Sequence, residues 1–91
     1  MSILLNFKTP GFTVAKYEEA TKQLRAAGVG APEGRGYHVC YGDPNGVSVT
    51  DVWDNIEDFK AFGQILIPIL QSLGVDIAQP DVQEVHNIVL G

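Results

Sequence analysis

The sequence has a single cysteine, Cys40, among its 91 residues, and this excludes a disulfide within the chain. Small extracellular domains commonly depend on disulfides, so the single cysteine favours a reducing, cytoplasmic location. Cys40 follows Val39 in a run of strand-forming residues and is expected to be a small buried apolar side chain. No basic segment precedes the apolar residues 3–5, so no signal peptide is expected.

Basic residues are also scarce. The chain has six lysines and arginines against eleven acidic residues, which gives a formal net charge of −5, and the six are scattered along the sequence. Phosphate binding requires clustered cations, so no nucleic-acid partner is expected. No apolar run reaches the roughly 18 residues that a membrane-spanning helix needs, so no membrane partner is expected either.

Hydrophobic periodicity and turn residues divide the chain into strands and helices. The expected elements are a strand at 2–8, a helix at 14–27 capped by Thr13, a hairpin at 34–54, a helix at 56–73 capped by Asp54 or Asn55, and a strand at 82–90. Pro68 lacks a backbone N–H, so the second helix is expected to kink or break at residues 63–68. The order predicts a single α+β domain over residues 1–91 with a ferredoxin-like βαββαβ fold, an antiparallel sheet in the order 4-1-3-2, and both helices on one face.

The hairpin carries most of the side chains that are capable of chemistry. Its turn, Asp43-Pro44-Asn45-Gly46, has type I chemistry with a glycine that can close a bulge, which predicts a loop at 44–46. Because side chains alternate along a strand, this register places on one face Tyr37, Val39, Tyr41, Val47, Val49, Asp51 and Trp53, and on the other His38, Cys40, Ser48, Thr50 and Val52. It therefore excludes a direct contact between His38 and Asp51.

Two helices cover only one face of such a sheet, and neither face of the hairpin is polar enough to be left in water. A second copy packed sheet against sheet about a two-fold axis is the simplest cover, so we predict a homodimer. The face with Tyr37, Asp51 and Trp53 is assigned to the helices and to any pocket beneath them. The face with His38 and Cys40 is assigned to the partner subunit, and the reverse assignment stays open because the two faces differ little in apolar content.

The segment Val52-Trp53-Asp54-Asn55-Ile56-Glu57-Asp58-Phe59, the length and the order of elements resemble the dimeric α/β-barrel superfamily, especially its small antibiotic-biosynthesis-monooxygenase-like members. The resemblance covers essentially the whole chain. It implies a ligand pocket between the sheet and the helices. It also implies a choice of activities: cofactor-independent, quinone-forming oxygenation, haem degradation, or isomerisation in ring-cleavage pathways.

The resemblance also points to site residues. Asn6 and Trp53 resemble two pocket residues of the haem-degrading branch. That branch ligates iron with a histidine on the second helix, whereas Phe62 and Gly63 occupy the corresponding region here and no histidine occurs at 55–73. The glycine-rich residues 28–34 lack the Gly-Lys-Ser/Thr of a phosphate-binding loop. Neither haem nor any other cofactor is therefore expected.

Asp51, His38 and His86 are the candidate catalytic groups. Asp51 is expected in mid-strand on the same face as Trp53, where an unpaired carboxylate is costly. It either hydrogen-bonds a tyrosine, an amide or a lysine as a structural group, or acts as a base in the pocket. Both histidines are expected inside strands, where a histidine is most often structural. A zinc site from His38, Cys40 and His86 lacks closely spaced ligands, so no metal is predicted.

The leading hypothesis is a homodimer that binds a small aromatic or polycyclic organic molecule, and the sequence leaves open whether it is an enzyme. If it is, the resemblance implies cofactor-independent oxygenation or isomerisation, in which one of the three candidate groups takes a proton from a phenol or enol. The oxyanion would be held by Asn6, Tyr37 or Tyr41, and Trp53 would form either core or pocket wall. The alternative is a non-catalytic homodimer without a pocket, whose inward polar residues only set the register of the core.

Overall fold

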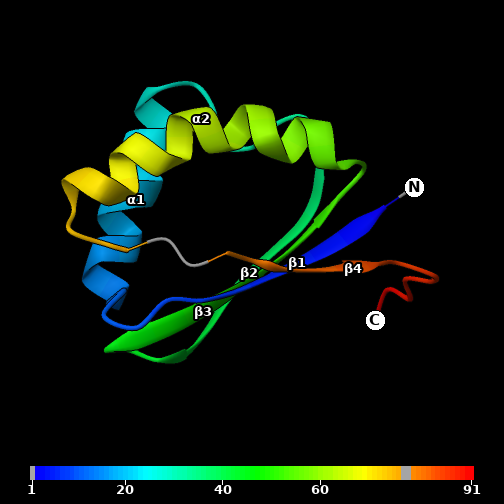
Figure 1. Ribbon diagram of the computed structural model, residues 1–91, viewed down its shortest axis with the longest axis horizontal. Coiled ribbons are helices and arrows are strands. Elements are labelled where there is room, and N and C mark those ends of the chain that lie inside the picture. Colours follow the sequence, from blue (N-terminus) through cyan, green and yellow to red (C-terminus); the bar gives the residue numbers. More distant parts are fainter. Residues whose placement is uncertain (1, 77–78) are drawn as a thin grey trace.

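The computed structural model describes residues 2–76 and 79–91. The elements follow in the order β1 (Ile3–Lys8), α1 (Val14–Ala26), β2 (Arg35–Asp43), β3 (Gly46–Trp53), α2 (Ile56–Ser72) and β4 (Asp81–Glu84). The strands form one antiparallel sheet in the order β2-β3-β1-β4, and both helices lie on the same face of it (Figure 1). The predicted ferredoxin-like α+β fold and its strand order are confirmed.

Side-chain caps begin both helices. Thr13 accepts a hydrogen bond from the first turn of α1, and Asn55 accepts one from Asp58 N at 2.8 Å. α2 then runs through Pro68 to its end, so the helix does not break at 63–68. Pro68 and Gln64 both lie on the exposed side of α2, where water can satisfy the carbonyl that the proline leaves unpaired. No helix in the described residues is both long and apolar enough to cross a membrane.

The register of β2 and β3 differs by one residue from the predicted one. The turn holds two residues, because Asp43 pairs with Gly46, and His38 consequently lies opposite Asp51. A shift of one residue exchanges the two faces of a strand. In β2, His38 and Cys40 therefore face the helices, and the outer face carries Tyr37, Val39 and Tyr41. The predicted separation of His38 from Asp51 and the assignment of His38 and Cys40 to a partner subunit are wrong.

β3 keeps the predicted orientation. Its buried residues are the alternating Val47, Val49, Asp51 and Trp53, which face the helices. Near the start of β2, Arg35 pairs with Trp53 while Tyr37 pairs with Val52, so Gly36 is an extra residue in a β-bulge. A bulge interrupts the alternation of a strand and re-aims the side chain before it. Arg35 therefore points toward the helices, on the same face as Trp53.

Local contacts at the turn explain the two-residue loop. The Asp43 carboxylate accepts a hydrogen bond from Asn45 N at 2.9 Å, which closes the turn from within. Val14 N, at the start of α1, donates to Pro44 O at 2.9 Å, and a second backbone bond joins Val47 to the segment before the helix. The start of α1 thus holds the hairpin at its turn and fixes α1 relative to β2 and β3.

Buried apolar side chains form two clusters between the sheet and the helices. One contains Phe12, Ala20, Val47, Leu70 and Val75, and the other contains Leu5, Leu24, Trp53 and Phe62. Leu66 and Ile69 of α2 pack against both clusters. Trp53 is fully buried, with its ring 5.4 Å from that of Phe62, so it is a core residue.

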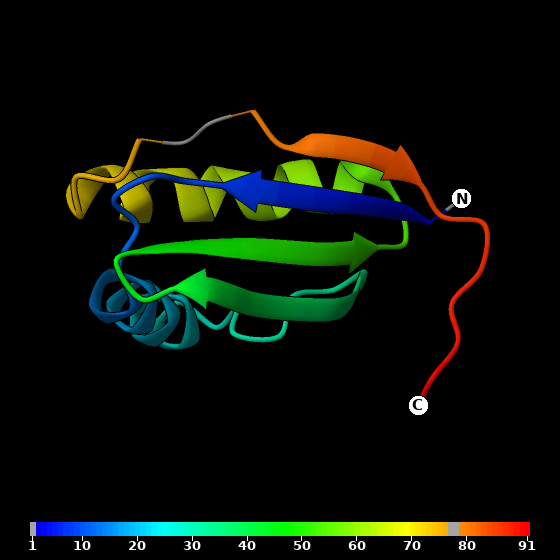
Figure 2. The same ribbon diagram turned by 90° about the horizontal axis from the view of Figure 1, so that it is seen from below.

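β4 is shorter than predicted. It pairs with β1 over four residues, and the last pair joins Glu84 to Ile3. Ile3 is the first residue of β1. No residue of β1 is left to pair with a longer strand, so residues 85–91 form no regular element. His86 is therefore exposed and outside the sheet, and its predicted place in a strand is wrong. This final segment runs past the ends of the strands (Figure 2), and its residues 88–91 lie beside Tyr37 and Val39 on the outer face. No helix in the part of the chain that the structure describes covers that face (Figure 2).

An engineered disulfide tests the observed register. Cys40 lies opposite Val49, and directly opposed strand residues have the short Cα separation that a disulfide requires. We expect V49C to form an intrachain disulfide under mild oxidation. Thr50 is next to Val49 in β3 but lies on the outer face, so T50C is the matched control and should keep both thiols free. Thiol titration and intact mass distinguish the two variants. A disulfide in T50C alone would show that the turn has three residues.

Candidate functional site

A cavity of about 250 Å³ lies between the inner face of the sheet and the two helices. Its lining includes members of both core clusters, so it separates one cluster from the other. Seven of its fifteen lining residues are phenylalanine, leucine or valine. The groups capable of chemistry are Tyr17, Thr21, Arg25, Arg35, His38 and Asp51.

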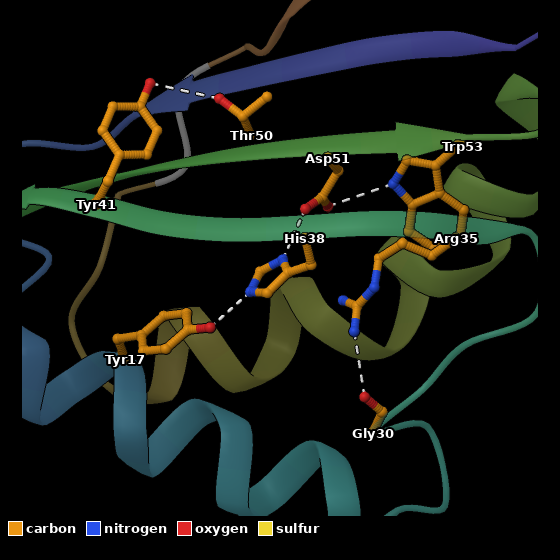
Figure 3. A network of polar contacts seen from close by, with 8 residues as sticks. All are labelled: Tyr17, Gly30, Arg35, His38, Tyr41, Thr50, Asp51 and Trp53. Carbon is orange, nitrogen blue, oxygen red and sulfur yellow. Dashed lines mark hydrogen bonds and ion pairs between the residues drawn. The ribbon is translucent and has the colours of Figure 1, made fainter. Parts of the chain in front are cut away.

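A chain of hydrogen bonds forms part of the cavity wall (Figure 3). His38 Nδ1 lies 2.6 Å from Asp51 Oδ1, and His38 Nε2 lies 2.5 Å from the hydroxyl oxygen of Tyr17. Trp53 Nε1 donates to the second carboxylate oxygen of Asp51 at 3.3 Å. The histidine of β2 thus connects Asp51 on β3 to Tyr17 on α1.

The hydrogen-bond partners of Asp51 are the basis for assigning the protons of this chain. Asp51 is 4% exposed, and each of its oxygens has a hydrogen-bond partner. An ionised carboxylate only accepts hydrogen bonds, so His38 donates to it from Nδ1. Nε2 of the neutral imidazole is then left to accept the hydroxyl proton of Tyr17. A buried carboxylate that orients a histidine in this way is an arrangement suited to acid–base chemistry.

Tyr17 is held as a neutral phenol. Burial raises the pKa of Tyr17 above the ordinary value of 10.0, and the acidic groups of Cys40 and Asp51 raise this pKa further, while Arg35 opposes them. Burial also raises the pKa of the Cys40 thiol, which packs partly buried against one apolar cluster, as expected of a small apolar side chain. Because Tyr17 keeps its proton, it can donate to His38 and accept a hydrogen bond at the same oxygen.

The structure brings together only part of the predicted site. His38 and Asp51 line the cavity, and Trp53 supports Asp51 from behind. Asn6 and Tyr41 lie on the outer face, away from the cavity. There, Asn6 Nδ2 donates to the Tyr41 oxygen at 3.4 Å, and the hydrogen bonds from Thr50 and from Asn6 lower the pKa of Tyr41.

Two further predicted residues also lie away from the cavity. Tyr37 is on the outer face, and His86 is in the exposed segment after β4. Within the ranges that the structure describes, no three His, Cys, Asp or Glu side chains are grouped to hold a metal ion.

Sequence reasoning missed polar residues of the cavity wall, among them Tyr17, Thr21, Arg25 and Arg35. Tyr17 and Arg25 are eight positions apart on α1, with Thr21 midway, and a spacing of four places side chains on one stripe of a helix. That polar stripe was a usable signal, because it interrupts an otherwise apolar face. Arg35 gave no such signal, since its direction depends on the bulge at Gly36.

The comparisons with known proteins agree on the fold. No protein-family model and no curated protein matches the chain in sequence. SnoaB, a cofactor-independent oxygenase from Streptomyces nogalater, is 17% identical, with 97% of this chain and 94% of SnoaB covered and a TM-score of 0.61. A proposed antibiotic biosynthesis monooxygenase from Deinococcus radiodurans is 15% identical, with 99% and 97% covered and a TM-score of 0.62.

A third structure, the protein YJCS, is 12% identical, with 94% of this chain and 100% of that chain covered and a TM-score of 0.66. At these identities the similarity shows the fold alone. It confirms, at the level of the fold, the resemblance to antibiotic-biosynthesis-monooxygenase-like proteins that the sequence suggested.

The raised pKa of Tyr17 predicts a loss of stability at alkaline pH. The unfolded chain ionises Tyr17 near pH 10 and the folded chain only at higher pH, so ionisation favours unfolding between these two values. The contribution is fully present below about pH 10 and is lost as the pH rises through the folded pKa. We expect Y17F to remove this part of the alkaline loss.

Urea unfolding at about pH 8 and about pH 11 measures the effect for wild type and variants. Y37F, at an exposed tyrosine on the outer face, is the control and should lose as much stability as the wild type. Cys40 titrates in the same direction and is present in every variant, so its contribution cancels in the comparison. An alkaline loss in Y17F equal to that of the wild type would show that Tyr17 is not buried as described.

Proposed function

We propose that the protein binds a small phenolic or enolic molecule in the cavity and removes a proton from it without a cofactor. The hydrogen-bonded chain of Tyr17, His38 and Asp51 in the wall of a largely apolar cavity carries this proposal. The apolar wall excludes water and holds the ring of the ligand. The chain supplies a base whose orientation is fixed before the ligand arrives.

The proton transfer balances along the chain. The ligand O–H donates to the oxygen of Tyr17 while Tyr17 passes its own proton to His38 Nε2. The products are a ligand anion, an unchanged tyrosine and an imidazolium that is hydrogen-bonded to the Asp51 carboxylate. Tyr17 never becomes a free phenolate, which its burial disfavours.

The similarity of fold to a cofactor-independent oxygenase supports dioxygen as the second substrate. A carbanion equivalent formed by deprotonation reacts with O₂ by forming one C–O bond. Loss of water then converts the original CH₂ carbon to a carbonyl, so that R₂CH₂ and O₂ become R₂C=O and H₂O. Isomerisation would use the same residues without dioxygen, by returning the proton to a different carbon of the ligand.

The size of the cavity restricts the ligand. Its volume of about 250 Å³ is below the range of about 300–1,000 Å³ that is usual for drug-sized ligands. A molecule of one or two rings fits this volume better than the larger polycycle that the sequence also allowed. The cavity itself favours ligand binding over the alternative of a homodimer without a pocket.

We propose further that the outer face of the sheet is the homodimer interface. Val39 is 50% exposed and Tyr37 and Tyr41 are 38% and 43% exposed, all three on the edge strand β2. An apolar surface of this kind typically marks an interaction site. Among the described residues no helix or strand covers it, and the exposed apolar residues 88–91 lie beside Tyr37 and Val39 (Figure 2). We also propose that the protein is cytoplasmic, because its single cysteine cannot form a disulfide within the chain.

The acid–base role is tested with 2-naphthol, whose phenolate is detected by its absorbance. We expect the wild type to lower the apparent pKa of bound 2-naphthol. D51N should abolish most of this effect, by about tenfold or more in the phenolate-to-phenol ratio, because an amide facing His38 reverses the imidazole tautomer. T50A, next to Asp51 but on the outer face, is the control. Equal phenolate fractions in wild type and D51N would exclude His38 and Asp51 as the base.

The dimer is tested by sedimentation at micromolar concentration. V39K places a charge in the proposed interface and is expected to convert a dimer to a monomer of 9.8 kDa. I65K changes a comparably exposed apolar residue on α2 and is expected to leave the dimer intact. The proposed interface would be contradicted if the wild type sedimented as a stable monomer. It would also be contradicted if I65K, and not V39K, disrupted the dimer.

A further inference from the structure

Both arginines of the chain, Arg25 and Arg35, line the same cavity, and no lysine lines it. The protein has almost twice as many acidic as basic residues, eleven against six. Even so, neither arginine has a carboxylate within ion-pair distance in residues 2–76 and 79–91, where the only such contact joins His38 to Asp51. The two guanidinium groups therefore line a cavity of an acidic protein without an ion-pair partner among the described residues.

The bulge at Gly36 is what directs Arg35 to the cavity side of the sheet. Figure 3 shows its side chain extending from β2 on the same side as His38 and Trp53. Arg35 Nη2 donates to Gly30 O at 3.2 Å, and the guanidinium carbon lies 5.7 Å from the centre of the Phe62 ring. A guanidinium has five N–H donors, so most of them remain available to a ligand.

Gly30 brings the second arginine to the same place. A Cβ atom at Gly30 would lie 2.8 Å from Arg25 Cγ, so the absence of a side chain lets the loop pack directly on the stem of Arg25. The same residue supplies the carbonyl that holds Arg35. Arg25 and Gly30 are both exposed, so this end of the cavity reaches the surface. The two arginines thus lie on either side of Gly30 at the mouth.

From this juxtaposition we propose that Arg25 and Arg35 bind the carboxylate of an aromatic hydroxy acid whose rings occupy the cavity. The inference rests on the proposed function, because it names the class of molecule that the base would act on. A guanidinium binds a carboxylate through paired, charge-assisted hydrogen bonds, and both arginines line the end of the cavity that reaches the surface. The positive mouth also attracts an anion that the rest of the surface repels.

The spacing along α1 sets the shape of the ligand. Tyr17, which would accept the proton, and Arg25 are eight residues apart, which is about 12 Å of helix. The carboxylate at the arginines and the acidic hydroxyl at the proton-accepting chain therefore belong at opposite ends of the molecule. Two fused rings with the two groups at their far ends meet this requirement and fit the volume of the cavity.

Calorimetric titration with two matched probes tests the inference. 6-Hydroxy-2-naphthoate carries the carboxylate and the hydroxyl at opposite ends, and 2-naphthol has the same rings and hydroxyl without the carboxylate. We expect the wild type to bind the naphthoate at least about tenfold more tightly than 2-naphthol. Hydrogen bonds between charged groups contribute more to binding than hydrogen bonds between neutral groups. R25Q and R35Q should each reduce this preference, and the double variant should abolish it.

K22Q is the matched control, because Lys22 is an exposed cation on α1 and its loss changes the net charge equally. It should keep the preference. Arg25 is exposed, so R25Q is expected to fold. R35K keeps the positive charge of Arg35 and removes the planar guanidinium, so it tests the geometry of the contact with the carboxylate. Equal affinity of the wild type for both probes would overturn the inference and leave the proposed function intact if 2-naphthol is still bound and deprotonated.

Three other outcomes are also decisive. A preference for the naphthoate that persists in the double arginine variant would overturn the inference, because the carboxylate would then bind elsewhere. Loss of the preference in K22Q to the same extent as in R25Q would overturn it too, since only net charge would matter. Failure of the wild type to bind either probe would overturn both the inference and the proposed function.

Discussion

The hydrogen bond between His38 and Asp51 depends on a turn of two residues between β2 and β3. A third residue in the turn would move His38 to the outer face and leave the buried Asp51 carboxylate with the Trp53 N–H alone. A buried carboxylate without adequate partners is strongly destabilising, so the 2.6 Å contact with His38 stabilises the register that creates it. The start of α1 supports the same register by docking on the turn at Pro44.

The cavity follows from this register. With His38 on the inner face, Tyr17 of α1 hydrogen-bonds it directly. The hydrogen-bonded residues Tyr17, His38 and Asp51 then lie between the two apolar clusters. The bulge at Gly36 then adds Arg35 to the same side. One hairpin therefore supplies both a histidine and an arginine to the cavity, and α1 adds Tyr17 and Arg25. The proposed organic acid would use these residues as its proton acceptor and as its carboxylate-binding site.

The elements and their order could be predicted because periodicity, capping and turn residues are local. Thr13 and Asn55 cap helices as expected, and β3 presents the predicted face. The face of β2 could not be predicted, since Asp43-Pro44-Asn45-Gly46 suits a loop of two or of three residues and only docking by α1 decides between them. The extent of β4 depends on where β1 begins, which is a tertiary constraint. Asn6 and Tyr41 were attractive by residue type, but their strands turn them away from the helices.

The protonation state of His38 is the most direct test of the account. Nitrogen-15 NMR of labelled protein, with H86Q used to assign the two histidines, distinguishes the tautomers of the neutral imidazole. The account predicts a proton on Nδ1 and none on Nε2, and a change of tautomer in D51N. A proton on Nε2 in the wild type, or a spectrum of His38 that D51N leaves unchanged, would contradict the claim that Asp51 orients His38 as the base of this site.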